Sequence, residues 1–165
     1  WLKETLQKTK ASLKLVFIFY FVGGADNKGI GRGGAEAARF FEWGGWNQDS
    51  TAGFVANRPG WDKPIHDLLV QYKVNVVFHG HDHLFVKQDL DGIVYQTLPQ
   101  PGAIRYGNIN SAKEYGYNNG TVLNAPGYLR VSVENGKALV EYIQTSISPK
   151  QKNKDILFSY TIHTK

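Results

Sequence analysis

Three histidines stand within five residues of one another, at His79, His81 and His83, and Asp82 lies between the last two. Neutral imidazole is the commonest protein ligand for divalent metal ions, and alternating histidines can turn their nitrogen lone pairs toward one point. A single histidine at the end of a strand is usually an ordinary surface or core residue. Three so close together have no evident use in packing, so the spacing predicts a metal site.

An apolar run of β-branched and aromatic residues, 74–78, directly precedes the histidines and is typical of a buried strand. Gly80 lets the backbone turn where this strand ends. The segment 65–72 has apolar residues at helical spacing after Pro64, so it predicts a helix that leads into the strand. The histidines are therefore expected in or just beyond the turn at the end of a strand.

The segments before and after this region predict further elements. Residues 13–22 predict a central strand covered on both faces, and residues 35–43 predict a helix that stops at Gly44. Strand, helix, helix and strand in this order form a βαβ-type crossover, whose expected result is a parallel pair of strands. After the histidines the pattern changes to hairpins and a last strand, predicted over residues 84–88, 93–97, 128–133, 138–143 and 157–162.

The predicted fold class is α/β with α+β character toward the C-terminal end. It is part of a layered β-sandwich with flanking helices, in which a mixed sheet is followed by antiparallel hairpins. Residues 1–165 are interpreted as a single domain or a fragment of one. An α/β part over residues 1–101 carries the histidines, and residues 102–165 add antiparallel strands and a basic C-terminal segment. Long polar loops are expected at residues 46–61 and 100–126, and such loops often border a site.

Composition narrows the class of protein. The 165 residues are 42% hydrophobic and 20% charged, as in ordinary globular domains, and no apolar run reaches the ~20 residues needed to cross a bilayer. The net charge of +5 comes largely from C-terminal lysines, so neither a nucleic-acid nor a membrane partner is predicted. A basic balance mildly favours anionic substrates such as phosphate esters. Without cysteine or a visible targeting signal, the sequence leaves the compartment unknown.

The segment Gly29–Gly34 suggests an alternative, because it matches the pattern Gly-x-Gly-x-x-Gly between a predicted strand and a predicted helix. In a dinucleotide-binding site such glycines let a pyrophosphate sit on a helix N-terminus. Here the glycines lie well beyond the end of the strand, and the region around Asp49 is a loop rather than a second strand that carries an acid. A nucleotide-binding domain is therefore the less favoured hypothesis.

The block Gly80-His81-Asp82-His83 after an apolar strand resembles the last signature block, Gly-His-x-His, of the calcineurin-like metallophosphoesterases. The resemblance covers residues 1–101, and residues 102–165 resemble the antiparallel strands that complete the second sheet of that fold. It implies a centre of two divalent ions, Mn, Fe or Zn, at which a metal-bound hydroxide attacks the phosphorus of a phosphate mono- or diester. It also implies that His81 binds the second ion and His83 the first. His79 and Asp82 would support these ligands from behind.

The chain departs from the family pattern in two ways. The earlier blocks Asp-x-His, Gly-Asp and Gly-Asn-His-Asp/Glu do not occur in it, which suggests the C-terminal part of the fold, truncated or processed from a longer parent protein. The bridging aspartate and further ligands would then lie on a missing N-terminal segment, the expected partner of this chain. In addition, Phe19 or Tyr20 stands where the family has a metal-binding histidine. Phenylalanine cannot bind a metal ion.

Two histidines without a carboxylate make an incomplete site, because a catalytic metal ion normally needs three or more protein ligands. The main hypothesis is therefore a phosphoesterase parent of which this chain alone is inactive. The alternative is a noncatalytic scaffold or binding module that kept the fold and lost a full metal site. Loop residues Tyr106, Tyr115 and Tyr117 could line a substrate cleft, and His66 is interpreted as a structural histidine of its helix.

Overall fold

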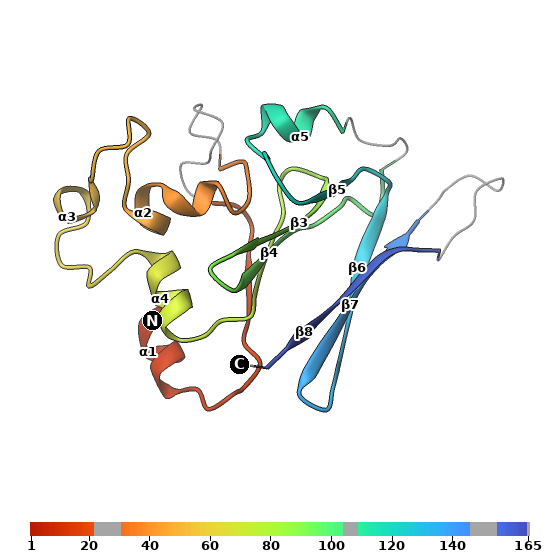
Figure 1. Cartoon of the computed structure of the whole chain (residues 1–165), viewed down its shortest axis with the longest axis horizontal. Helices are drawn as coiled ribbons and strands as arrows, with labels where there is room; N and C mark the ends of the chain where they lie inside the picture. The colour runs from red at the N-terminus through yellow and green to blue at the C-terminus, as the bar shows by residue number, and fades with distance from the viewer. Residues whose placement is uncertain (22–30, 104–108, 146–154, 165) are drawn as a thin grey trace.

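Residues 1–21, 31–103, 109–145 and 155–164 are described by a computed structural model, in which short helices, a mixed sheet and an antiparallel sheet lie in succession (Figure 1). The architecture is α+β, as the sequence pattern predicts for the C-terminal end. Among the described residues no helix is long and apolar enough to cross a membrane.

The mixed sheet has five strands in the order β1-β2-β4-β3-β5. β1 pairs with β2, and β2 with β4, in parallel, which confirms the predicted parallel pair, whereas β3 is antiparallel to both β4 and β5. β2 is buried over its whole length because it lies between two strands and between two layers. The strands are β1 (Leu15–Ile18), β2 (Val76–His79), β3 (Phe85–Leu90), β4 (Ile93–Thr97) and β5 (Thr121–Leu123).

The second sheet is antiparallel and consists of β6 (Gly127–Glu134), β7 (Lys137–Gln144) and β8 (Ile156–His163), close to the three strands predicted there. One hydrophobic cluster joins the two sheets, and its fully buried members include Val76 from β2 and Val140 from β7. Aromatic contacts extend this interface, since the rings of Phe85 and Tyr142 stack with their centroids 4.5 Å apart. The predicted sandwich of a mixed and an antiparallel sheet is therefore present.

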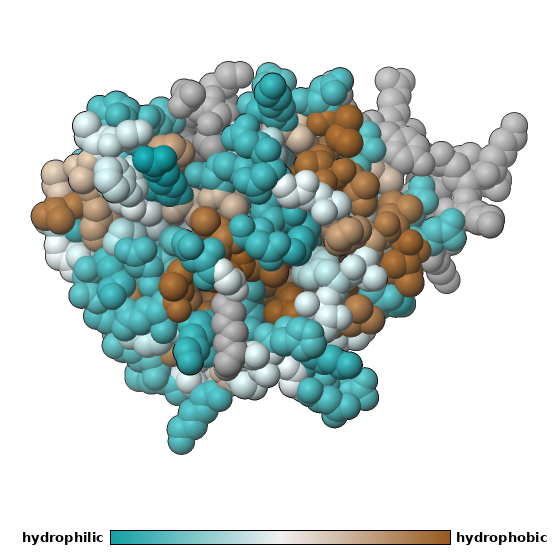
Figure 2. Space-filling model, viewed as in Figure 1, coloured by the Kyte–Doolittle hydropathy of each residue, from teal (hydrophilic) through white to brown (hydrophobic). Residues whose placement is uncertain are grey.

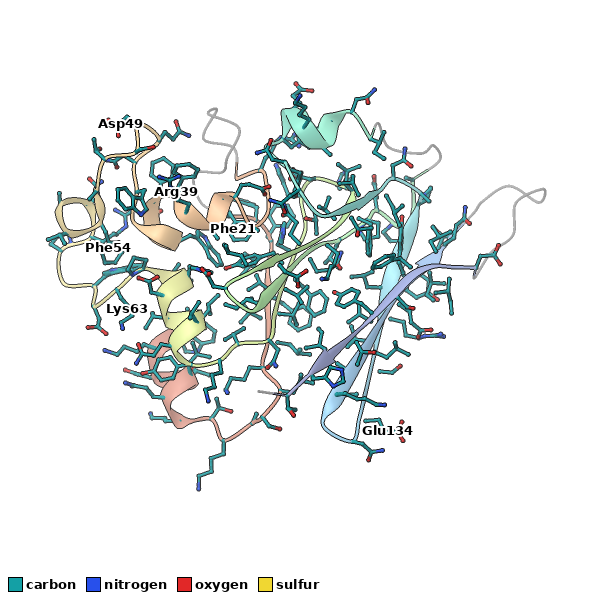
Figure 3. All side chains as sticks on the ribbon, viewed as in Figure 1. Phe21, Arg39, Asp49, Phe54, Lys63 and Glu134 are labelled. Carbon is teal, nitrogen blue, oxygen red and sulfur yellow. The ribbon has the colours of Figure 1, made fainter. Side chains whose placement is uncertain are left out.

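The helices cover the other face of the mixed sheet, apart from α5, which lies near β5 (Figure 1). Phe21 lies in the cluster between the helix layer and the sheet, where its ring contacts Trp43 and Tyr95 (Figure 3). The helical elements are α1 (Leu2–Lys8), the 3-10 helix η1 (Ala37–Arg39), α2 (Phe41–Gly44), α3 (Phe54–Asn57), α4 (Ile65–Gln71) and α5 (Ser111–Glu114).

Two predictions about these elements are wrong. The helix predicted over residues 35–43 is split into η1 and α2, because Phe40 is extended and forms a β-bridge with Trp46. The strand predicted over residues 13–22 and covered on both faces is only the four-residue β1, and the ring of Phe17 is 68% exposed. Among the described strands, β1 pairs with β2 alone and so lies at the edge of the sheet rather than at its centre.

The predicted long loops contain short elements that local sequence patterns do not reveal. α3 lies within residues 46–61, and α5 and β5 lie within residues 100–126. β5 joins the mixed sheet by pairing with β3, so a strand from the segment 102–165 completes the sheet that carries the histidines.

Candidate functional site

His79 to His83, which we call the histidine loop, begins at the last residue of β2 and continues beyond the carboxyl end of that strand. Backbone hydrogen bonds tie its start to both neighbouring strands. The Gly80 N–H donates to the Phe19 carbonyl over 2.9 Å, and the Leu98 N–H donates to the His79 carbonyl over 2.8 Å. In sheets with parallel strands, ligands bind outside the carboxyl ends of the strands, and the histidine loop occupies such a position.

The backbone of the histidine loop is unusual at two histidines. His81 has φ +80° and His83 has φ +57°, both in the left-handed region that residues other than glycine rarely adopt. Such conformations cost about 1–3 kcal/mol each and persist only where the surrounding structure enforces them. The residue between them, Asp82, provides that enforcement.

The carboxylate of Asp82 is buried, and both of its oxygens accept hydrogen bonds. Arg32 donates from Nη1 to Oδ1 over 3.0 Å, the Gly33 N–H donates to Oδ2 over 3.0 Å, and the Tyr117 hydroxyl donates to Oδ2 over 2.8 Å. With both oxygens engaged in this way, Asp82 serves as an anchor for the loop rather than as a metal ligand.

The glycine-rich segment contributes to this anchor. Its first residues, Gly29 and Ile30, lie outside the described residues. In the described part, the Gly33 N–H donates to Asp82, and the Ala35 N–H donates to Oε1 of Gln88 over 2.9 Å. These backbone amides therefore donate to side chains of the protein itself. The helical element that comes directly after them, η1, is only three residues long. This geometry lends no support to the nucleotide-binding alternative.

His79, the first residue of the histidine loop, is buried with 1% of its surface exposed. Its Nε2 atom is 3.1 Å from Oγ1 of Thr97, and Thr97 Oγ1 is 2.9 Å from the Tyr117 hydroxyl oxygen. Burial lowers the pKa of His79 to about 3, so the imidazole is neutral at physiological pH. Hydrogen bonds thus connect His79, Thr97, Tyr117 and Asp82 in one buried chain.

Phe19 and Tyr20 lie directly against His81. The ring centroid of His81 is 5.5 Å from that of Phe19 and 5.4 Å from that of Tyr20. Phe19 is 66% exposed and Tyr20 is 46% exposed. The structure therefore brings His81 next to the end of β1, where the resemblance implies another ligand, and aromatic rings stand there instead.

His83 is exposed and borders a cavity of about 210 Å³. The walls of this cavity include the side chains of Gln100, Ser111, Tyr115 and Asn124. The described residues contain no group of three or more His, Cys, Asp or Glu side chains that could hold a metal ion. The donors that the described residues place here do not by themselves make a complete metal site.

The tyrosines proposed to line a cleft have different places. Tyr115 lines the cavity beside His83, and the guanidinium of Arg32 lies 3.9 Å from the centre of its ring. Tyr117 is buried, and burial together with the Asp82 charge raises its pKa well above the usual value. Tyr106 lies outside the described residues.

His66 lies away from the loop, where Nδ1 is 2.7 Å from the Tyr95 hydroxyl and Nε2 is 2.9 Å from Oδ2 of Asp91. Both ring nitrogens have protein partners, which suits a structural histidine. Sequence reasoning missed Arg32, Thr97 and the anchoring contact of Tyr117, because these residues reach the site through contacts that span between 18 and 50 positions. No local pattern in the sequence indicates such contacts.

No protein-family model matches the chain, and no curated protein matches it. Among solved structures, the chain is similar to GAP50, described as the anchor in the inner membrane complex of Plasmodium. The similarity has a TM-score of 0.57 and 13% sequence identity, and it covers 99% of this chain. This chain spans 41% of the length of that protein. At this level of identity, the similarity shows a shared fold alone.

Proposed function

We propose that this chain is the C-terminal part of a metal-dependent phosphoesterase that hydrolyses phosphate mono- or diesters. The observation that carries this proposal is the placement of His81 and His83 on a constrained loop beyond a parallel strand, on either side of the buried Asp82. The resemblance of Gly80-His81-Asp82-His83 to the metallophosphoesterase block supports the same assignment.

His81 and His83 would each hold one of two divalent ions, Mn, Fe or Zn. When bound, such a pair of ions supplies an activated water and neutralises charge on the phosphoryl oxygens. Asp82, held by Arg32 and Tyr117, keeps the two imidazoles in place. Because two imidazoles do not complete a site, we expect the isolated chain to be inactive.

The remaining ligands would come from a missing N-terminal segment of the same fold, and the open side of the sandwich supports this partner. β1 lies at the edge of the mixed sheet and exposes Phe17 and Phe19. Next to it is an apolar groove whose walls include Phe78, Leu98 and Leu129. The hydrophobic residues that Figure 2 shows over the upper ends of β5 and β6 form a separate patch, toward the edge of the mixed sheet opposite β1. An exposed strand edge beside apolar side chains is a natural site for a further strand.

A second candidate function is a noncatalytic scaffold or binding module. The specific observation in its favour is the packing of Phe19 and Tyr20 against His81, at the position where the family has a ligand. The structural neighbour GAP50, which shares the fold, is described as an anchor. In this case the fold would persist for binding, and the histidine loop would no longer hold two ions.

Metal titration distinguishes the two candidates. Calorimetry with Mn²⁺ and Zn²⁺ on the isolated chain should show weak binding that is lost in His81→Ala and His83→Ala. The control His163→Ala removes an exposed histidine at the end of β8 and should bind like the unaltered chain. An unaltered chain that binds neither ion would remove the support for the enzyme and favour the scaffold.

A hydrolysis assay tests the expected inactivity. The isolated chain with Mn²⁺ should not hydrolyse bis(p-nitrophenyl) phosphate, because the two histidines alone do not supply the three or more protein ligands that a catalytic metal ion needs. Hydrolysis that disappears in His83→Ala but persists in His163→Ala would show that the chain alone is an active enzyme.

A further inference from the structure

We infer that Tyr117 is a positioning residue for the histidine loop, which acts through its hydroxyl on Asp82. In its bearing on metal binding this inference rests on the proposed function. In its bearing on the conformation of the loop it stands independently, because it follows from contacts within the chain.

The Tyr117 hydroxyl bridges two structural elements. It donates to Oδ2 of Asp82 over 2.8 Å, and its oxygen is 2.9 Å from Oγ1 of Thr97. Thr97 is the last residue of β4, the strand next to β2, and its backbone lies opposite that of His79 in the parallel pair. One hydroxyl therefore connects the carboxylate of the loop to the rigid end of the neighbouring strand.

The hydroxyl acts on the point where the loop needs support. His81 and His83 both have left-handed φ values, which are unfavourable for side chains with a Cβ atom. Asp82 is the single residue between them. Its contacts to Arg32 and Gly33 come from a segment that precedes the histidine loop in the sequence, and its contact to Tyr117 comes from a segment that follows the loop. Removing one of these contacts should release part of the constraint on both neighbouring histidines.

Tyr117 itself is held in place without the loop. Tyr117 lies just beyond the end of α5, and its N–H donates to the carbonyl of Ala112 in that helix over 2.9 Å. The next two residues bind Glu36, since the Asn118 N–H and the Asn119 side-chain amide donate to Oε1 over 2.9 Å and 3.0 Å. The ring is also buried in the cluster that contains Val86. Tyr117→Phe should therefore keep its ring in place and lose the hydroxyl contacts alone.

The test compares Tyr117→Phe with Tyr160→Phe. Tyr160 is a suitable control because it also donates a hydroxyl to a side-chain acceptor, Oε1 of Gln96 over 2.9 Å, but does not contact the histidine loop. Amide hydrogen exchange of residues 80–84 and the imidazole C–H resonances of His81 and His83 report the loop conformation. Broadening of those resonances by Mn²⁺ reports metal affinity.

In Tyr117→Phe we expect exchange of residues 80–84 to accelerate by at least about 10-fold, the lower end of the range that corresponds to one hydrogen bond to a charged acceptor. The resonances of His81 and His83 should shift, those of His163 should not, and Mn²⁺ affinity should fall. Tyr160→Phe should leave all of these unchanged. Combining Tyr117→Phe with Asp82→Asn should change exchange no more than Asp82→Asn does alone, since Tyr117 acts through that carboxylate.

The inference is overturned if Tyr117→Phe leaves exchange and resonances as in the unaltered chain, or if Tyr160→Phe changes them equally. An effect of Tyr117→Phe that adds fully to that of Asp82→Asn would also overturn it. If the unaltered chain does not bind Mn²⁺, the proposed function loses its support. The exchange and resonance measurements then still decide whether Tyr117 positions the loop.

Discussion

At the scale of single residues, the rings of Phe19 and Tyr20 occupy the space beside His81 where the proposed function would require a further metal ligand. Their rings lie 5.5 Å and 5.4 Å from that of His81, which is close enough that a histidine at one of these positions could share an ion with His81. Whether the chain belongs to an enzyme or to a scaffold depends in large part on what this position can bind. Introducing a histidine at either position tests this directly.

We predict that Tyr20→His or Phe19→His raises the affinity of the isolated chain for Zn²⁺ by about 10-fold, because one further imidazole beside His81 gives the ion at that histidine a second nitrogen donor. Calorimetric titration of both variants measures the change. Adding His83→Ala to either variant should leave the gain in Zn²⁺ affinity in place if the new histidine and His81 alone bind the ion. Affinity unchanged in both variants would show that the end of β1 does not reach the site.

His79 predicts how stability depends on pH. Burial lowers the pKa of His79 to about 3, whereas the unfolded chain takes up this proton near pH 6.5. Since the unfolded state binds more protons between these values, stability should fall as the pH falls from about 6.5 toward 3, with a loss of about 3 kcal/mol near pH 4.5. Urea unfolding at neutral and acidic pH measures this loss. His79→Asn should show a smaller loss, and an equal loss would assign it to other groups.

At the scale of elements, the histidine loop depends on how β2 is fixed between its neighbours. Asn75, buried at the start of β2, binds two other segments: its Oδ1 accepts from the Lys14 N–H over 2.8 Å, and its Nδ2 donates to the His163 carbonyl over 2.9 Å. One amide therefore joins the approach to β1, the start of β2 and the end of β8. The Asn75 amide thus links the two sheets at the amino end of β2, whereas the histidine loop lies at the carboxyl end of the same strand.

We predict that Asn75→Ala lowers the free energy of unfolding by about 1–3 kcal/mol, because it removes two part-buried hydrogen bonds. Denaturant unfolding measures the loss. Gln71→Ala, which truncates an exposed amide of α4, serves as a control and should change stability by less than about 0.5 kcal/mol. A loss in Asn75→Ala no larger than in this control would show that Asn75 does not join the segments in solution.

At the scale of the whole molecule, three layers share the mixed sheet. The helix layer packs on one face of this sheet through Phe21 and Trp43, and the antiparallel sheet packs on the other through Val76 and Val140. All four tryptophans lie at positions 1 to 61, on the helical side, so tryptophan fluorescence reports that layer. Far-UV circular dichroism reports both sheets as well. A single domain should show one transition by both probes.

We predict that Val140→Ala, a change in the antiparallel sheet, shifts the fluorescence transition and the circular dichroism transition together by about 2 kcal/mol, because it leaves a cavity between the sheets. Val133→Ala is the matched control, since Val133 is 60% exposed on β6. Transitions that separate in Val140→Ala would mean that the antiparallel sheet unfolds independently, and that the chain contains more than one cooperative unit.

The sequence by itself determined the elements with local patterns. The apolar run before His79, the turn at Gly80 and the hairpins around Asp91-Gly92 and Asn135-Gly136 depend on neighbours within a few positions, and the structure confirms the strands that they predict. The position of the histidines at the carboxyl end of a parallel strand follows from the same patterns.

Only the tertiary structure decided the edge position of β1, the division of the predicted helix at Phe40 and the network that holds Asp82. Arg32 and Tyr117 reach Asp82 across 50 and 35 positions of sequence, and neither belongs to a pattern with it. The physical reason is that a strand or a turn follows from short-range backbone preferences. The partners of a buried carboxylate depend instead on which distant segments the packed core brings to it.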